Sequence, residues 1–89
     1  MEKNVKLILF KVDTVIISEV IEVDSELGDP NCKLINPCEW KKKEDSEEFF
    51  LTTWIEATNQ SEFMVRSEDI LTIADPLPEV IEKYLKLTE

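Results

Sequence analysis

Arg66, in the stretch VRSEDILTI at residues 65–73, is the sole arginine of an 89-residue chain whose nine other basic residues are lysines. Lysine and arginine serve equally well as solvated surface charge. Only arginine, however, has a planar guanidinium that stacks on a flat partner while its edge donates several hydrogen bonds. The single arginine therefore indicates a position that uses the planar fork, and not the positive charge alone.

The chain carries little of the chemistry that enzymes use. It has no histidine, one glycine and two cysteines, Cys32 and Cys38. Without histidine, two cysteines separated by five residues predict neither a zinc site nor a disulfide framework, and they lack a base to activate a thiol. We expect two reduced thiols in or near strands, no enzymatic activity, no cofactor and no metal, with the 20 acidic residues at the surface.

Acidic residues outnumber basic ones in both halves, and the formal charge is −10. Residues 1–46 carry seven basic and ten acidic side chains, whereas residues 47–89 carry three basic and ten acidic ones. Without a broad basic footprint, any RNA or DNA must bind a small local site against an unfavourable electrostatic field.

No apolar run approaches the about 20 residues of a membrane span, and the N-terminus does not fit a signal peptide. We therefore expect a cytoplasmic protein with no membrane partner.

Runs of β-branched residues predict strands over most of the chain. The first two, at 5–11 and 14–24, meet in a tight turn at Val12–Asp13, and both are apolar on both faces, which favours a curled barrel or a face covered by another subunit. The sole glycine, Gly28, marks the next turn. Further strands are predicted at 32–35, 49–58, 62–66 and 69–75, with a charged loop at 39–48. Lys41, Lys42 and Lys43 make this loop the only basic cluster, and the acids after them predict a self-neutralising hairpin tip.

The last segment changes period. Apolar residues recur every three or four positions over residues 77–87, which predicts a short amphipathic helix. Asp75 is the expected N-cap, with Pro76 in the first turn. We expect this helix to pack as a lid on an open end of the barrel, within a single domain spanning residues 1–89 whose barrel covers about 5–75.

Val65, Arg66, Ile70 and Ile73 resemble the second signature of the Sm/LSm family, which includes bacterial Hfq. Ser67 replaces the usual glycine, and the sole arginine falls on the arginine of the family. The resemblance implies a mainly β fold, a small, strongly bent, five-stranded Sm-like (SH3-like) barrel, here with a short C-terminal α-helix. It also implies a homo-oligomeric ring of roughly five to seven subunits, in which the fourth strand of one subunit pairs with the fifth of the next.

The first signature of the family is matched more loosely. Ser18 stands at its glycine, Asp24 at its aspartate and Asn31 at its asparagine, although more residues separate Asp24 from Asn31 than in the family. Asp29 occupies the place where an aromatic residue or histidine usually stacks on a base. The resemblance thus implies a pore-side site for single-stranded RNA or DNA that contains Asn31, Arg66, Asp29 and Ser67. In length and acidity the chain is also similar to short reading frames of marine cyanophages, which implies the host cytoplasm.

A structural interpretation of the same residues stays open. Asn31 follows Pro30 and suits the capping of a turn, while Arg66 suits an ion pair with Glu68 or Asp69 that holds a hairpin. The chain is then a structural or protein-interaction module built on the same barrel. One form of that alternative is an acidic inhibitor that occupies the nucleic-acid site of another protein.

Overall fold

The structure, a computed structural model, describes residues 4–11, 14–24, 26–27 and 30–88. Within these residues it contains six strands, a short 3-10 helix and one α-helix. They are β1 (Val5–Phe10), β2 (Val15–Glu22), β3 (Cys32–Lys42), β4 (Phe49–Thr53), β5 (Glu62–Val65), η1 (Ser67–Asp69), β6 (Ile70–Ala74) and α1 (Pro78–Thr88). The prediction of a mainly β fold with a short C-terminal helix is confirmed. The six strands match the number of predicted strand segments and differ from the five of the barrel that the resemblance implies. The predicted turns at Val12–Asp13 and Gly28 lie outside the described residues.

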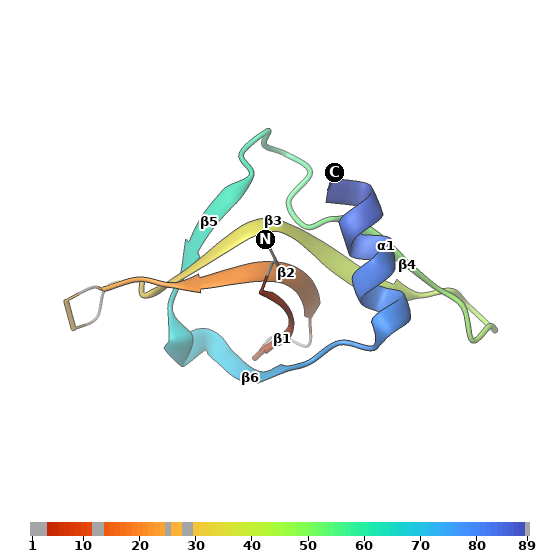
Figure 1. The fold of residues 1–89 in the computed structure, drawn as a ribbon, viewed down its shortest axis with the longest axis horizontal. Helices are drawn as coiled ribbons and strands as arrows, with labels where there is room; N and C mark the ends of the chain where they lie inside the picture. Colours follow the sequence, from red (N-terminus) through yellow and green to blue (C-terminus); the bar gives the residue numbers. More distant parts are fainter. Residues whose placement is uncertain (1–3, 12–13, 25, 28–29, 89) are drawn as a thin grey trace.

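All six strands belong to one open antiparallel sheet. Its order is β4-β3-β2-β1-β6, and β5 pairs with the first part of β3, on the same edge as β4. β5 and β6 therefore lie on opposite sides of the sheet, yet only residues 66–69 separate them in the chain. Because a link of this length reaches at most about 18 Å, the sheet must curl to bring its two sides together (Figure 1).

β3 contains a local irregularity in its pairing with β2, at the point where the strand predicted from the sequence ends. Its pairing with β2 shifts register between Ile17 and Glu19. On β3, Asn36 takes up the shift with a φ of 52°, in the left-handed region that asparagine tolerates. The strand predicted at 32–35 therefore runs on to Lys42, and residues 39–42, predicted as loop, belong to it. This extra length lets one edge of β3 pair with both β4 and β5.

Two hydrophobic clusters occupy the two faces of the sheet. The inner core consists of Ile8, Phe10, Ile16, Val20 and Leu34, with half-buried Val65 of β5 and Ile70 of β6 packed against it. Because β5 and β6 come from opposite sides of the sheet, the curl brings residues of both sides against this cluster. The helix-side core consists of Val5, Ile17, Cys38, Leu51, Val80 and Tyr84. Neighbours in β2 such as Ile16 and Ile17 alternate between the two cores, as side chains do along a strand.

The second apolar face of β1 and β2 is covered by the chain's own helix. Val80 and Tyr84 of α1 are buried against residues of β1, β2, β3 and β4, and Figure 1 shows α1 lying beside β4. The helix therefore packs across a face of the sheet, which corrects the expectation of a lid on an open barrel end. The apolar pattern of β1 and β2 is thus explained without a second subunit on that face.

The helix begins later than the sequence indicates. Pro78 takes the first helical position, where the missing N–H of proline has no intrahelical partner to lose. The carbonyl of Leu77 accepts from the N–H of Val80 over 3.0 Å and of Ile81 over 3.1 Å. Asp75, the expected N-cap, instead forms an ion pair with Lys6 of β1. No helix in the described part of the chain has the length and apolar character needed to cross a membrane.

Candidate functional site

Asn31 and Ser67 are joined by two hydrogen bonds although 36 positions separate them in the chain. The backbone N–H of Ser67 donates to Oδ1 of Asn31 over 2.8 Å, and Nδ2 of Asn31 donates to Oγ of Ser67 over 3.0 Å. The backbone N–H of Asn31 also donates to the carbonyl oxygen of Val65 over 3.2 Å. Asn31 therefore lies directly against the stretch that contains the single arginine. We call Asn31, Arg66 and Ser67 the Asn31–Ser67 site.

These contacts orient the amide of Asn31. A backbone N–H only donates, so the atom that faces the N–H of Ser67 must be the amide oxygen. One N–H of Nδ2 and one lone pair of Oδ1 are used by Ser67, which leaves one donor and one acceptor on opposite flanks of the amide. Each of the two can form a single hydrogen bond with a ligand, such as an edge atom of a nucleic-acid base.

Arg66 links β5 to η1 in an extended conformation, with φ −88° and ψ 134°. Its side chain is exposed. Within the described residues it pairs with neither Glu68 nor Asp69, the partners that the structural interpretation assigned to it. The turn is closed by the backbone instead, since the N–H of Asp69 donates to the carbonyl of Arg66 over 3.1 Å. The guanidinium therefore does not hold this turn together, and its face lies open to solvent.

The charge around Arg66 is predominantly acidic. Glu68 and Asp69 follow it directly in η1. Lys33, which lies on β3 two residues after Asn31, forms an ion pair with Glu62 of β5 over 3.0 Å. A ligand at this site thus meets one guanidinium among carboxylates, which favours contacts with a neutral base over contacts with phosphates.

The structure brings together three of the four residues predicted for this site. Asn31, Arg66 and Ser67 meet at the junction of β5, η1 and the start of β3. Asp29, the fourth, lies outside the described residues.

A family model, described as a family of unknown function and designated DUF6561, matches residues 3–89. The chain belongs to this family. The match takes in every strand and α1, so the DUF6561 domain is the whole fold described above. No curated protein matches the chain.

A buried polar cluster of this DUF6561 domain was not predicted from the sequence. The hydroxyl of Tyr84 donates to the carbonyl of Ile35 over 2.7 Å and accepts from the N–H of Glu19 over 3.0 Å. Oγ of the fully buried Ser18 lies 3.1 Å from the same carbonyl. These bonds give partners to backbone groups of Glu19 and Ile35, where the register between β2 and β3 shifts. The cluster therefore links α1 to this irregular part of the sheet. The available signal was a tyrosine in an apolar helical stripe, whose hydroxyl needs a buried partner.

The two cysteines of the DUF6561 domain are free and lie in β3, as the sequence indicated, and both are buried. Burial raises the pKa of both thiols, and the carboxylate of Glu22 raises the pKa of Cys32 further. Because the thiolate is the nucleophile and metal ligand, a raised pKa lowers the reactivity of both groups. Within the described residues, no group of three or more ligating side chains is placed to hold a metal ion.

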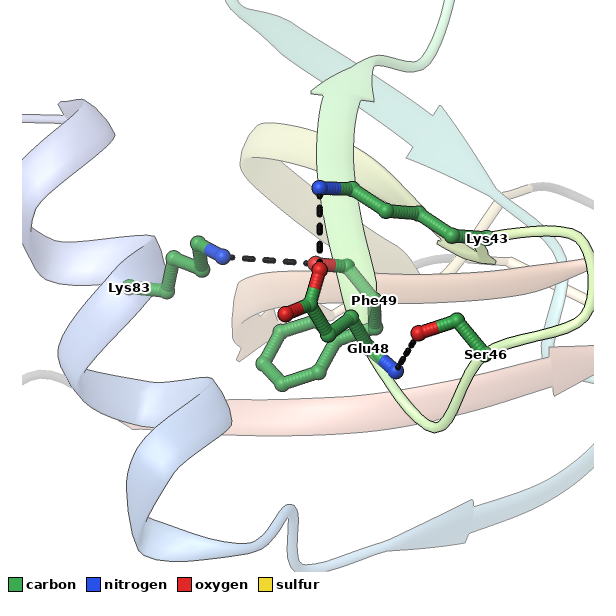
Figure 2. A network of polar contacts seen from close by, with 5 residues as sticks. All are labelled: Lys43, Ser46, Glu48, Phe49 and Lys83. Atoms are coloured by element: carbon green, nitrogen blue, oxygen red, sulfur yellow. Dashed lines mark hydrogen bonds and ion pairs between the residues drawn. The ribbon is translucent and has the colours of Figure 1, made fainter.

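The lysine cluster is neutralised by its neighbours. Lys43 pairs with Glu48 over 3.2 Å, Lys42 with Glu47 over 3.9 Å, and Lys41 with Glu39 over 4.0 Å. The prediction that acidic neighbours neutralise these lysines is confirmed, but Lys41 and Lys42 belong to β3, and only Lys43 lies in the loop of the hairpin. Figure 2 shows the base of this hairpin, where Lys83 of α1 donates to the carbonyl of Phe49 over 3.3 Å. Its Nζ also lies 4.8 Å from the centre of the Phe49 ring, a cation–π contact.

Proposed function

We propose that the protein is a ring-forming, Sm-like protein that binds single-stranded RNA or DNA weakly, with one base at each Asn31–Ser67 site. The observation that carries this proposal is the pair of hydrogen bonds by which Asn31 is held against Ser67, the chain neighbour of the exposed Arg66. The amide of Asn31 keeps one free donor and one free acceptor, either of which can bond to a base, and the guanidinium offers a face for stacking.

The free edges of the sheet support assembly. Ile73 of β6 pairs with Ile8, whose side chain is fully buried, so both lie on the inner face of the sheet. Ile73 nevertheless remains 45% exposed, and Leu71 is 64% exposed. The inner core is thus incompletely covered along β6. Pairing of β6 with β5 of a second copy covers these side chains and satisfies both edges, and repeated head-to-tail pairing closes a ring.

The link between β5 and β6 also supports an Sm-like arrangement. Residues 66–69 join strands from opposite sides of a curled sheet, and the Asn31–Ser67 site lies on this link. In a ring built from β5 and β6 edges, the site is therefore next to every subunit junction. Repetition around the ring adds avidity to a site whose single contacts are weak.

Substitution of the arginine by lysine tests the base contact. Arg66→Lys keeps the charge and removes the planar face, so binding of a uridine-rich or adenine-rich oligomer should weaken by about 1–3 kcal/mol per engaged base in fluorescence anisotropy. Lys86→Met, in the last turn of α1, is the control because it removes a charge and leaves Arg66 intact. Weakening by Lys86→Met with unchanged binding by Arg66→Lys would show that net charge, and not the guanidinium, governs affinity.

The net charge of −10 favours a second candidate, an acidic module that binds a basic protein. Such a module needs the fold and its surface carboxylates but not the guanidinium. A pull-down with the intact protein separates the two functions. Co-purification of RNA supports the nucleic-acid proposal, and capture of a basic nucleic-acid-binding protein in nuclease-treated extract supports the acidic module.

A further inference from the structure

A cavity of about 620 Å³ lies between the edge of β4 and the segment that leads to β5. Its walls include Leu51 and Thr53 of β4, residues 58–61 of the connecting segment, and Leu87 at the end of α1. The lining also includes residues 36–38, where β3 passes through its irregularity, and Phe63. The volume is in the range of ordinary ligand pockets, roughly 300–1,000 Å³. Neither Asn31 nor Arg66 lines this cavity, so the proposed binding of nucleic acid does not involve it.

The ladder between β3 and β4 shows which backbone groups face the cavity. The N–H of Lys43 donates to the carbonyl of Glu48 over 2.9 Å, and the N–H of Trp54 donates to the carbonyl of Pro37 over 3.3 Å. Glu48 and Trp54 thus direct their polar groups toward β3 at the two ends of β4. In an antiparallel pair this direction alternates, so Phe49, Leu51 and Thr53 direct their N–H and C=O groups outward.

A contact on the outer edge agrees with this alternation. The carbonyl of Phe49 accepts a hydrogen bond from Lys83 of α1, which occupies the edge at that end (Figure 2). Leu51 and Thr53 both line the cavity, and their outward backbone groups have no backbone partner among the described residues. The cavity therefore has an unpaired strand edge as one wall.

The other walls are uncharged. In the part of the chain that the structure describes, no acidic or basic side chain lines the cavity, although 34% of the residues of the chain are charged. The lining combines amide and hydroxyl side chains, such as Asn59 and Ser61, with apolar ones, such as Phe63 and Leu87. Such walls suit peptide amides and small neutral side chains, whereas a buried charged side chain would find no partner.

We propose that this cavity is a peptide-binding groove, in which a short, extended and uncharged segment of a partner protein adds as a strand to the outer edge of β4. The outward N–H and C=O groups of Leu51 and Thr53 bond the peptide backbone, which supplies affinity. The neutral walls select against Asp, Glu, Lys and Arg in the segment. Lys83 closes the edge at Phe49, so the added strand is limited to the cavity end of β4.

Binding of a defined peptide tests the groove. An acetylated, amidated peptide of alternating threonine and valine is titrated into isotopically labelled full-length protein, and backbone amide resonances are followed by NMR. We expect saturable shifts of Leu51, Thr53 and Asn59. The same peptide with N-methylated alternate amides should shift none of them, since methylation removes the backbone donors and keeps the side chains. A version with glutamate in place of threonine should also fail to bind.

Two variants at one position isolate the edge donor. Thr53→Pro removes an outward N–H, which an edge strand tolerates, and should weaken peptide binding about fivefold or more. Thr53→Ala keeps the N–H and should bind within about twofold of the parent, on the same scale. If Thr53→Pro does not fold, the N-methylated peptide decides the question. Equal binding of the methylated peptide, or the absence of saturable shifts, overturns the proposal. Shifts of the same resonances on concentrating the protein alone identify a second copy as the occupant and also overturn it.

Discussion

The helix-side core and the inner core are built from adjacent residues of the same strands, yet only one is completed by its own chain. On the helix side, α1 buries Tyr84 to 1% exposure and fastens it to the backbone of β2 and β3. On the inner side, the sheet curls around Ile8 but leaves Ile73, its cross-strand neighbour, partly exposed. The difference separates the part of the molecule that stabilises the fold from the part to which the proposed function assigns association.

The edges of the sheet repeat this contrast. At β4 the helix contributes Lys83, whose bond to the carbonyl of Phe49 occupies part of the edge. At β6 the exposed residues include Leu71 and Ile73, and in the described residues no helix or loop is hydrogen-bonded along its outer edge. Unprotected apolar edges pair with other chains. We therefore expect the helix-side core to determine whether the domain folds, and the β6 edge to determine whether it assembles.

The largest effect should come from removing the anchor of the helix-side core. Tyr84→Ala leaves a cavity where a fully buried ring packs, and should lower the free energy of unfolding by about 3–5 kcal/mol, a large fraction of the stability of a small domain. Denaturant unfolding followed by circular dichroism measures this change. Leu87→Ala, at an exposed position of the same helix, is the control and should stay within about 0.5 kcal/mol. Similar losses in both variants would show that α1 is not anchored through Tyr84.

The next effect concerns the β6 edge. Leu71→Lys should weaken each contact between subunits by about 1.5–3 kcal/mol, the contribution of burying one leucine, while the fold stays stable. Leu77→Lys is a closely matched control, because Leu77 is 63% exposed and lies in the connection between β6 and α1. Sedimentation velocity at several concentrations measures both variants. If Leu77→Lys dissociates the assembly and Leu71→Lys does not, the contact is not on β6.

A smaller effect should appear at alkaline pH. Burial raises the pKa of Tyr84, although the N–H of Glu19 partly opposes this shift, and burial likewise raises the pKa of both cysteines. The unfolded chain then releases these protons at lower pH than the native protein. Stability should be fully retained below about pH 8 and should fall as the pH rises past the ordinary pKa values of cysteine and tyrosine.

Tyr84→Phe separates the contribution of the phenol. This variant should lose about 1–3 kcal/mol at neutral pH, since the carbonyl of Ile35 and the N–H of Glu19 each lose a partner. Its stability should then fall less steeply than that of the parent above about pH 10, where an unfolded tyrosine ionises. Unfolding free energies at neutral and alkaline pH give the two slopes. Identical slopes would mean that Tyr84 ionises as readily in the native protein as in the unfolded chain.

Local patterns predicted most of the elements. The strands predicted at 5–11, 62–66 and 69–75 correspond to β1, β5 and β6, and the helical period gave α1 to within a residue at each end. The length of β3 was missed because Asn36 and Pro37 indicate a break when only neighbours in sequence are considered. The left-handed conformation of Asn36 and the bonds of Tyr84 around the irregularity depend on contacts between distant residues, and no local pattern encodes them.

The candidate site was predicted in a different way. Composition singled out Arg66, but the placement of Asn31 and Ser67 in the same site followed only from the resemblance to two sequence signatures, and their hydrogen bonds were not predicted. The structural interpretation of Arg66 assigned it to Glu68 or Asp69 because they are close in sequence, and the backbone of η1 directs the chain without that ion pair. The cavity beside β4 had no signal in the sequence, because it depends on β4 and β5 pairing with the same edge of β3.

The mass of the protein in solution tests the central claim, that the inner core and the β6 edge are completed by further copies of the chain. Sedimentation equilibrium at micromolar concentration measures this mass without reference to shape. We predict a closed assembly with a mass several times the 10.4 kDa of one chain, unchanged on further concentration. A single species of 10.4 kDa would contradict the claim and would remove the avidity on which weak binding of nucleic acid depends.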